Sequence, residues 1–352
     1  MAASADRSEP RAIPSVPVGA LFEAPGPARD RCDAALFRAA SGVGFLTVTE
    51  LPAAIAPTAA VRADLKRLFT TDDAVRRRLW RRKFAPTHPN VYRGWFPAQG
   101  GAATYKEGID MGPDVAHADF RSDPADPLTE PTPLPPESDL PGWRAAVARY
   151  YLGMESLARE LTRSLARGLG IPERSFEPIF AGGGLSTLRL IRYPPRPPGS
   201  FAGAPEPETF VEHGGRRRYT VGAAHVDSGC MTLLAQDGVD GLQARSADGA
   251  WLDVPPAADA VVVNFGALLG RWTGGRIRAT EHRVLGADRE RFSIPFFYEP
   301  RVDAVIAPLP IADGPQFEPF VFGDYLWEAV TRFVEFRGLE SARTPRVSAG
   351  PG

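Results

Sequence analysis

The sequence predicts a mixed α/β (α+β) fold, in which a helical N-terminal region leads through one long helix into an antiparallel β-sandwich or barrel. Apolar residues recur at helical spacing in the first half. The segment Arg144–Leu169 reads as a long amphipathic helix that follows Pro141 and is stopped by Gly168 and Gly170. From Leu185 onward the chain changes to short β-type runs separated by turns, which is typical of sandwiches and barrels.

The N-terminal region is expected to hold short elements between two irregular stretches. We expect a flexible tail over residues 1–12 and an irregular segment over residues 113–141, which is rich in Pro, Asp and Ser. Long irregular segments inside a compact fold are often functional, so we predict a lid at 113–141. The elements expected between them are a strand at Ile13–Leu21, helices at Asp30–Ser41, Thr58–Leu68 and Thr71–Trp80, and a strand at Phe45–Val48.

The second half is expected to supply the β core. Its expected strands are Thr187–Arg192, Met231–Ala235, Gly241–Arg245, Ala260–Phe265 and Phe292–Tyr298, followed by a helix at Phe322–Phe336. No internal repeat is visible, so we expect one integrated unit. Its segments would be the tail (1–12), the N-terminal region with its lid (13–141), the long helix with its connection (142–180), the β core (181–300) and the C-terminal helix and tail (301–352).

Composition narrows the class of protein. The 352 residues carry a formal net charge of −1, which argues against a general nucleic-acid binder. Cys32 and Cys230 make no disulfide framework, so a reducing cytoplasm is expected. The N-terminus lacks the apolar core of a signal peptide, and no run reaches the roughly 18 apolar residues of a membrane helix. The basic run at 76–83 is either a solvated helix face or a rim that attracts an anionic substrate.

One pair of residues raises the possibility of a metal site. His225 and Asp227 stand two apart before an apolar β-type run, and residues at that spacing share one face of a strand. A third ligand must come from elsewhere, and His282 lies on a later β-type segment. Two histidines and one carboxylate leave three positions of an octahedral ion open, which suits Fe(II) that activates O₂. The alternative is that the pair is only the polar end of a strand.

A second pair points to an anion. Arg291 and Ser293 project from one face of an expected strand whose other face is Phe292, Ile294 and Phe296. An arginine inside a barrel needs an anionic partner, and a guanidinium can bind a carboxylate through two parallel hydrogen bonds. The alternative is that Arg291 faces solvent among its charged neighbours.

The order of motifs along most of the chain, from about Ile13 to Tyr325, carries a resemblance. The motifs are Gly44-Phe45-Leu46, Arg192-Tyr193-Pro194-Pro195, His225-Val226-Asp227-Ser228-Gly229, Val263-Asn264-Phe265-Gly266, His282-Arg283-Val284 and Arg291-Phe292-Ser293. In this order the sequence resembles the isopenicillin N synthase-like family of Fe(II)/2-oxoglutarate-dependent dioxygenases. The resemblance implies a double-stranded β-helix (jelly-roll) core with the metal inside one end, backed by the long helix.

The resemblance also implies roles for individual residues. His225, Asp227 and His282 match the Fe(II) ligands of the family. Arg291 and Ser293 match the pair that holds the distal carboxylate of 2-oxoglutarate. Tyr193 matches a tyrosine that reaches the same carboxylate in many members, although a packed aromatic residue is the alternative for it.

Substrate contacts are expected in segments that line the mouth of the site in this family. The candidates are Tyr92, Arg93, Tyr105, Lys106 and Phe297. Arg93 and Lys106 would favour an acidic substrate, but ordinary ion pairs are the alternative for both.

The resemblance implies an oxygenase that uses Fe(II), O₂ and 2-oxoglutarate to oxidise a small molecule, with release of succinate and CO₂. Hydroxylation is the commonest outcome in the family, and desaturation and ring formation are others. Three alternatives stay open: a 2-oxoglutarate-independent iron oxidase of the isopenicillin N synthase type, ethylene formation from 2-oxoglutarate, and a non-catalytic jelly-roll sensor. We expect no nucleic-acid or membrane partner, and either a monomer or a homodimer.

Overall fold

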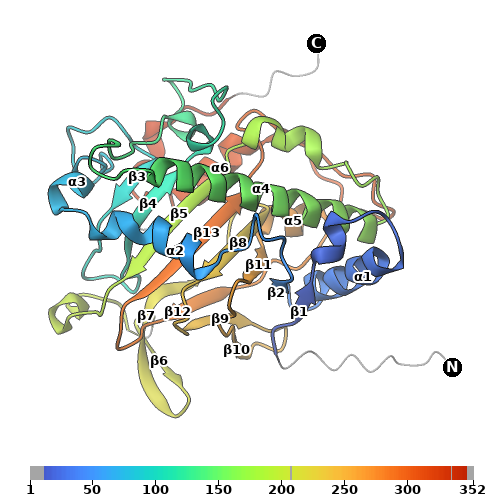
Figure 1. The fold of residues 1–352 in the computed structure, drawn as a ribbon, viewed down its shortest axis with the longest axis horizontal. Helices are drawn as coiled ribbons and strands as arrows, with labels where there is room; N and C mark the ends of the chain where they lie inside the picture. The colour runs from blue at the N-terminus through green and yellow to red at the C-terminus, as the bar shows by residue number, and fades with distance from the viewer. Residues whose placement is uncertain (1–11, 207, 334, 347–352) are drawn as a thin grey trace.

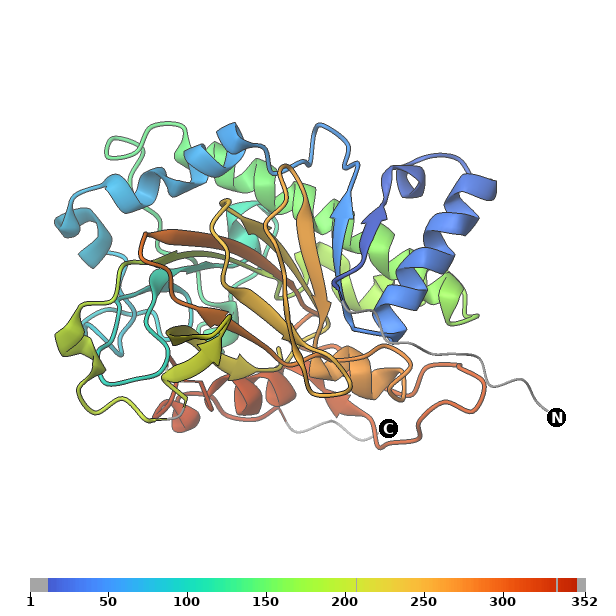
Figure 2. The same cartoon turned by 90° about the horizontal axis from the view of Figure 1, so that it is seen from below.

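The computed structural model describes residues 12–206, 208–333 and 335–346, so all but the last residue of the tail expected at 1–12 lies outside the described residues. A long helix, α4 (Trp143–Gly168), lies across one face of a large sheet, and a smaller sheet covers the other face (Figure 1). The turned view in Figure 2 shows α2 (Ala59–Lys66) and α4 on one side of the sheets and α6 (Phe322–Val330) on the opposite side.

The large sheet joins both halves of the sequence. Within the described residues its strand order is β1-β2-β11-β8-β13-β5-β4-β3, and every pair is antiparallel except the parallel pair β1 and β2. Its strands are β1 (Ser15–Pro17), β2 (Phe45–Thr49), β3 (Gly94–Phe96), β4 (Glu107–Met111), β5 (Thr187–Tyr193), β8 (Met231–Gln236), β11 (Val261–Phe265) and β13 (Arg291–Tyr298).

The smaller sheet has the order β10-β9-β12-β7-β6. Its strands are β6 (Phe210–His213), β7 (Arg216–His225), β9 (Leu242–Arg245), β10 (Trp251–Asp253) and β12 (His282–Leu285), and a separate hairpin pairs β14 (Val305–Ile306) with β15 (Phe320–Val321). The remaining helices are α1 (Pro27–Ser41), α2 (Ala59–Lys66), α3 (Asp73–Arg77) and α5 (Ala267–Trp272). The sequence did not predict β3, β4, β6, β10, β14, β15 or helix α5, and it indicated β7 only at its end, where His225 was expected on a strand.

Helix α4 explains why the central strands are apolar on both faces. It buries Leu157, Leu161 and Leu165 at helical spacing against the large sheet. Since the smaller sheet covers the other face, every residue of β8 and β11 is buried. Truncating one such leucine to alanine is expected to cost about 2–5 kcal/mol of folding free energy.

A second apolar cluster lies between the two sheets. The large sheet contributes Phe45, Ile191 and Tyr193, and the smaller sheet contributes Val221 and Ala244 among others. This cluster fills part of the space between the sheets, and the polar side chains of the candidate site face the same space.

Several boundaries differ from the sequence prediction. The expected strand at Ile13–Leu21 is only Ser15–Pro17 followed by a 3-10 turn, and the C-terminal helix ends at Val330 rather than at Phe336. The helix expected at Thr58–Leu68 begins where predicted, because the Thr58 side chain accepts a hydrogen bond from the backbone N–H of Val61.

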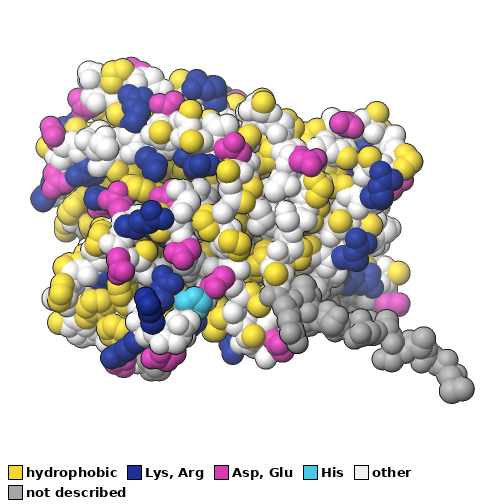
Figure 3. Space-filling model, turned by 60° about the horizontal axis from the view of Figure 1, so that its bottom comes forward, with side chains coloured by type: hydrophobic (Ala, Val, Ile, Leu, Met, Phe, Trp, Pro, Cys, Tyr) yellow, Lys and Arg dark blue, Asp and Glu magenta, His cyan; other side chains and the backbone are white. Residues whose placement is uncertain are grey.

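The surface carries mixed charge. Basic and acidic side chains are interspersed over the face drawn in Figure 3, in keeping with the net charge of −1. None of the helices in the described residues is long and apolar enough to cross a membrane.

Candidate active site

Three potential metal ligands meet where β7 and β12 lie side by side. His225 is the last residue of β7 and pairs in register with His282, the first residue of β12. Asp227 lies just beyond β7, and its Oδ1 atom is 3.5 Å from Nε2 of His225 and 3.7 Å from Nε2 of His282. The potential ligand atoms of the three residues all lie within 4.8 Å of one another, close enough to hold one ion.

Each histidine is oriented by a backbone carbonyl. Nδ1 of His225 donates to the carbonyl oxygen of Ala223 at 2.8 Å, and Nδ1 of His282 donates to that of Thr280 at 3.2 Å. Because a carbonyl oxygen can only accept, the proton of each neutral ring is on Nδ1. The lone pair of each Nε2 is therefore free for a metal, and the ring is held in the right tautomer.

The two oxygens of the Asp227 carboxylate have different surroundings. Oδ2 accepts hydrogen bonds from Oγ1 of Thr232 at 2.6 Å and from Nδ2 of Asn264 at 2.8 Å. Burial alone would raise the pKa of Asp227, but the positive charge that His282 and His225 carry when protonated, together with the hydrogen bond from Thr232, holds this pKa well below its ordinary value. Oδ1 is therefore a charged ligand atom that faces the two histidines.

The protonation state of the second histidine also suits a metal. Burial, with help from His225, lowers the pKa of His282 to about 4, although the charge of Asp227 acts in the opposite direction. A neutral imidazole is the form that binds a metal ion. Two histidines and one carboxylate are the donor set that fits non-haem Fe(II) with open positions.

The prediction that strand alternation aligns His225 with Asp227 is wrong. Strand β7 ends at His225, and Asp227 lies in the irregular turn before β8, so no strand alternation aligns the two side chains. Instead the turn is held by its backbone, since the N–H of Ala267 donates to the carbonyl of Asp227 at 2.7 Å. A Cβ on Gly266 would lie 2.2 Å from the carbonyl oxygen of Gly229, so this close packing requires glycine.

The two residues that were expected to bind an anion are buried, so they place a positive charge inside the protein. Arg291 and Ser293 are 1% and 3% exposed on the inner face of β13, and Nη1 of Arg291 donates to Oγ of Ser293. Nη2 donates to Oε1 of Gln236 at 3.2 Å, and the guanidinium lies 5.1 Å from the ring centre of Tyr193. No carboxylate of the described residues forms an ion pair with Arg291, so this buried charge has no anion of the protein's own.

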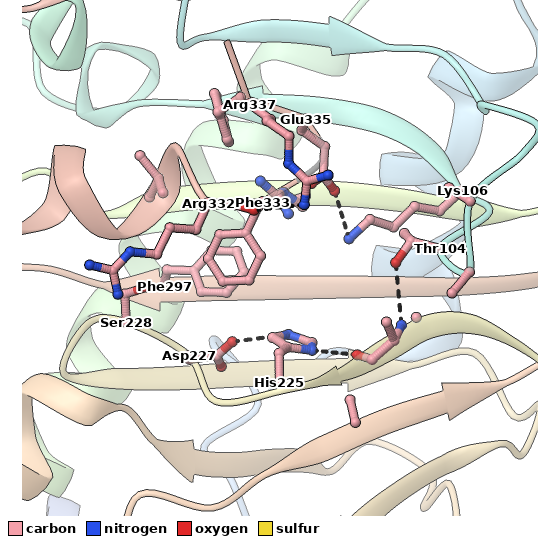
Figure 4. A pocket seen from close by; sticks show the side chains of 18 of the residues that line it. Thr104, Lys106, His225, Asp227, Ser228, Phe297, Arg332, Phe333, Glu335 and Arg337 are labelled. Atoms are coloured by element: carbon pink, nitrogen blue, oxygen red, sulfur yellow. Dashed lines mark hydrogen bonds and ion pairs between the residues drawn. The ribbon is translucent and has the colours of Figure 1, made fainter. Parts of the chain in front are cut away.

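A cavity of about 460 Å³ opens next to the triad. His225 and Asp227 lie on one side of it, and Lys106 and Glu335 lie on the opposite side (Figure 4). Of the predicted substrate contacts, Tyr92, Lys106 and Phe297 line this cavity.

Two predicted substrate contacts do not line the cavity. Arg93 is fully buried behind its wall, where Nη2 donates to the carbonyl of Leu185 at 3.2 Å and Nη1 donates to Oγ1 of Thr187. Tyr105 packs against Arg196, whose guanidinium lies 5.1 Å from its ring centre. Each is the sequence neighbour of a residue that does line the cavity, Tyr92 or Lys106. Adjacent residues in an extended segment point in opposite directions, so both of a pair do not reach the same cavity.

The cavity is covered by the C-terminal segment rather than by residues 113–141, so the lid prediction is wrong in its location. The ring of Phe333 lies 5.8 Å from that of His225, and Nζ of Lys106 forms an ion pair with Glu335 at 2.9 Å. No residue of 113–141 lines this cavity. That segment is fastened elsewhere, because the Glu130 carboxylate accepts hydrogen bonds from consecutive backbone N–H groups, beginning with that of Val91 at 2.9 Å.

The basic run at 76–83 also lies off the cavity. Arg76 pairs with Asp73, Arg78 pairs with Asp139, and Arg81 is fully buried against Asp110. No residue of the run lines the cavity, so it does not form a rim for an anionic substrate there.

One cavity residue was missed from the sequence. Glu299 follows β13 directly, is 7% exposed and lines the cavity. Burial and the charge of Asp227 raise the pKa of Glu299 to about 8, against the opposing effect of Arg93. The sequence does contain a signal for Glu299. Arg291 and Ser293 face inward at alternate positions of the strand, and the same alternation reaches residue 299 just after it.

Comparison with known proteins gives one family. The family model described as the 2OG-Fe(II) oxygenase superfamily matches residues 186–300. Proline hydroxylase buaE of Petromyces alliaceus is 31% identical over 313 residues, covering 82% of this chain and 87% of that protein. The 2-oxoglutarate-Fe(II) type oxidoreductase hxnY of Emericella nidulans is 36% identical over 192 residues, covering 53% of this chain. The match spans about half the length of that relative, at 51%.

A solved structure gives the same result for the fold. A full-length Neurospora crassa protein, solved in complex with alpha-KG and thymine, matches with a TM-score of 0.72 and 26% identity. The match covers 91% of this chain and 96% of that chain. The similarity therefore includes the N-terminal region as well as the two sheets.

Proposed function

The chain belongs to the 2OG-Fe(II) oxygenase superfamily, and from that premise we propose that it is an Fe(II)- and 2-oxoglutarate-dependent oxygenase of a small molecule. Hydroxylation is the reaction we propose first, with succinate and CO₂ as the products of the co-substrate. The two-sheet core would be the double-stranded β-helix of the family. We propose a cytoplasmic location.

In this proposal His225, Asp227 and His282 hold Fe(II). The two Nε2 atoms and Oδ1 face one another, while the Nδ1 atoms and Oδ2 are occupied by other hydrogen-bond partners, and this arrangement supports the assignment. Bound Fe(II), with O₂ and 2-oxoglutarate, supplies the oxidising chemistry. The protein contributes ligand geometry and a site shielded from bulk water.

The observation that carries the co-substrate assignment is the unpaired guanidinium of Arg291. A buried cation without an anion is costly, and the distal carboxylate of 2-oxoglutarate would neutralise it through charge-assisted hydrogen bonds. Ser293 adds a hydroxyl beside the same position, and Tyr193 supports the guanidinium from its ring face.

A 2-oxoglutarate-independent oxidase would use Arg291 to hold a carboxylate of the substrate. The position of Arg291 argues against this alternative, because neither Arg291 nor Ser293 lines the cavity that the substrate would enter. A substrate in this cavity would not meet Arg291, so the guanidinium fits a separate co-substrate better than the substrate.

The relatives support a small substrate. The Neurospora crassa structure contains thymine, and the Petromyces alliaceus protein is named a proline hydroxylase. A cavity of about 460 Å³ is of a size for molecules of that class.

The test is an anaerobic titration of the Fe(II)-loaded protein with 2-oxoglutarate. We expect the weak visible charge-transfer band of the chelate, and a loss of affinity for 2-oxoglutarate in Arg291→Ala. Arg289→Ala is the control, because Arg289 is exposed just before the same strand. Absence of the band, or equal affinity in Arg291→Ala, would overturn the co-substrate assignment.

A further inference from the structure

The carboxyl group of Glu299 has no partner within the protein. Oε2 is cut off from solvent and receives no hydrogen bond, and no Lys, Arg or His of the described residues forms an ion pair with Glu299. Its side chain lines the cavity beside Asp227 and Ser228. A buried carboxyl group in this state is costly, so it indicates a missing hydrogen-bond donor or cation.

The remaining charges deep in the cavity are already neutralised. Lys106 pairs with Glu335 at 2.9 Å, and Nη2 of Arg189 pairs with Oδ2 of Asp110 at 2.8 Å. Asp227 would be neutralised by the metal of the proposed function. Glu299 is therefore the one acidic group deep in the described part of the cavity wall that forms no ion pair, and the nearby Arg93 donates its hydrogen bonds to Leu185 and Thr187 instead.

Glu299 is also held in place before any ligand arrives. Its backbone N–H donates to Oγ of Ser186 at 3.2 Å, and its carbonyl accepts from the N–H of Leu185 at 3.3 Å. The carboxyl group packs on the backbone of Gly229, where a Cβ would lie 2.0 Å from Oε1. A carboxyl group fixed in this way loses little side-chain freedom when it binds a ligand.

Aromatic rings line the same cavity and suit a cation. Phe297, Phe333 and Tyr92 are among its lining residues, and Phe333 lies above His225. Ring faces attract an ammonium group, and a carboxylate opposite them adds a direct ion pair.

We propose that Glu299 is the residue that anchors the substrate, and that the substrate is a small molecule that carries a protonated amine. This inference rests on the proposed function only in placing a metal at Asp227. Glu299 follows the same strand that bears Arg291 and Ser293, so one strand would hold the co-substrate at one end and the amine at the other.

The experiment compares benzylamine with benzyl alcohol, which are similar in size and differ in charge at pH 7. Binding to the Fe(II)- and 2-oxoglutarate-loaded protein is measured anaerobically by calorimetry. We expect the wild type to bind benzylamine about tenfold or more tightly than benzyl alcohol, as a desolvated charge pair requires. Glu299→Gln keeps the size of the side chain but cannot ionise beside an ammonium group, so it is expected to abolish the preference, and the exposed Glu212→Gln is expected to keep it.

Equal binding of both probes by the wild type, or a preference that persists in Glu299→Gln, would overturn the proposal. The 2-oxoglutarate band in Glu299→Gln reports that the variant is folded, and Glu299→Asp is the second variant, in which a weakened preference for the amine is expected. The two proposals fail separately. A missing band in the wild type contradicts the co-substrate assignment, whereas the difference in probe preference between the wild type and Glu299→Gln, measured without metal, still tests Glu299.

Discussion

Asn264, the residue before the last in β11, donates a hydrogen bond of 2.8 Å to Oδ2 of Asp227 in the turn after β7. Together with Thr232, this bond occupies one carboxylate oxygen and leaves the other to face His225 and His282. Thr232 and Asn264, two residues of the large sheet that are not proposed as metal ligands, thus set the direction in which the carboxylate points.

Removing this hydrogen bond should weaken metal binding. We expect Asn264→Ala to lower Fe(II) affinity about 10–100-fold, because residues that orient a ligand typically have effects of that size. Equilibrium dialysis under anaerobic conditions measures the affinity. Asn90→Ala is the matched control, since Asn90 is also buried and donates one hydrogen bond, to the carbonyl of Pro131, away from the cavity. Unchanged affinity in Asn264→Ala would contradict the role.

The stability of the metal-free protein should depend on pH through Glu299. Its pKa is raised from an ordinary value of 4.5 to about 8, so between these values the folded state binds a proton that the unfolded state has lost. Stability therefore falls as pH rises through this window, by about 1.4 kcal/mol per pH unit at most. Glu299→Gln should remove this fall, so its advantage over the wild type should grow from pH 5 to pH 8 in urea unfolding.

Glu335 provides a control, because its pKa is shifted in the opposite direction from that of Glu299. Burial alone would raise its pKa, but Lys106 and Arg189 hold the pKa of Glu335 well below its ordinary value. Its stabilising contribution is present above the pKa of the unfolded state and is lost as pH falls, so Glu335→Gln should be less stable than the wild type at pH 7. The difference should shrink in acid. The same pH trend in both variants would contradict the assignment of these two groups.

The ion pair between Lys106 and Glu335 should hold the C-terminal cover in place. Their side chains are 15% and 6% exposed, so removing one partner leaves a buried charge. We expect Lys106→Met to lose about 2–5 kcal/mol locally and to speed amide exchange in the segment after α6. The double variant Lys106→Met with Glu335→Gln should recover part of this loss. Unchanged exchange in Lys106→Met would show that the segment is held by other contacts.

Gly229 should tolerate no side chain while Glu299 is present. A Cβ at Gly229 would meet Oε1 of Glu299 at 2.0 Å, so Gly229→Ala is expected to cost about 1–3 kcal/mol of stability. The cost should fall when Glu299 is also changed to alanine, because the two sites share one space. Gly199→Ala, where nothing lies within 4 Å, is the control. Additive effects in the double variant would contradict this packing.

Local patterns in the sequence were sufficient for the long helix and for the face of β13. Helix α4 was predicted to within one residue at each end, because its apolar period is long. Arg291 and Ser293 were predicted to share a buried face, which strand alternation requires. The proximity of His225 and His282 was predicted only from the order of motifs, since no local pattern in the sequence shows that β7 pairs with β12.

The remaining features depend on contacts between distant parts of the chain. Phe333 and Glu335 cover the cavity because the segment after α6 reaches His225 and Lys106, which a period in the sequence does not reveal. Arg93 was expected in the cavity and is buried behind it, where Leu185 and Thr187 accept its hydrogen bonds. Hydrogen bonds to distant residues, such as those from the backbone of Val91 to Glu130, likewise fix the position of residues 113–141. Composition does not reveal these bonds.

The most direct test of the account is the stoichiometry of Fe(II) binding in the wild type and in Asp227→Ala. We predict one tightly bound Fe(II) per chain for the wild type and none for the variant, with the fold of the variant checked by circular dichroism. A folded Asp227→Ala protein that still binds one Fe(II) tightly, or a wild type that binds none, would contradict the metal site on which the proposed function rests.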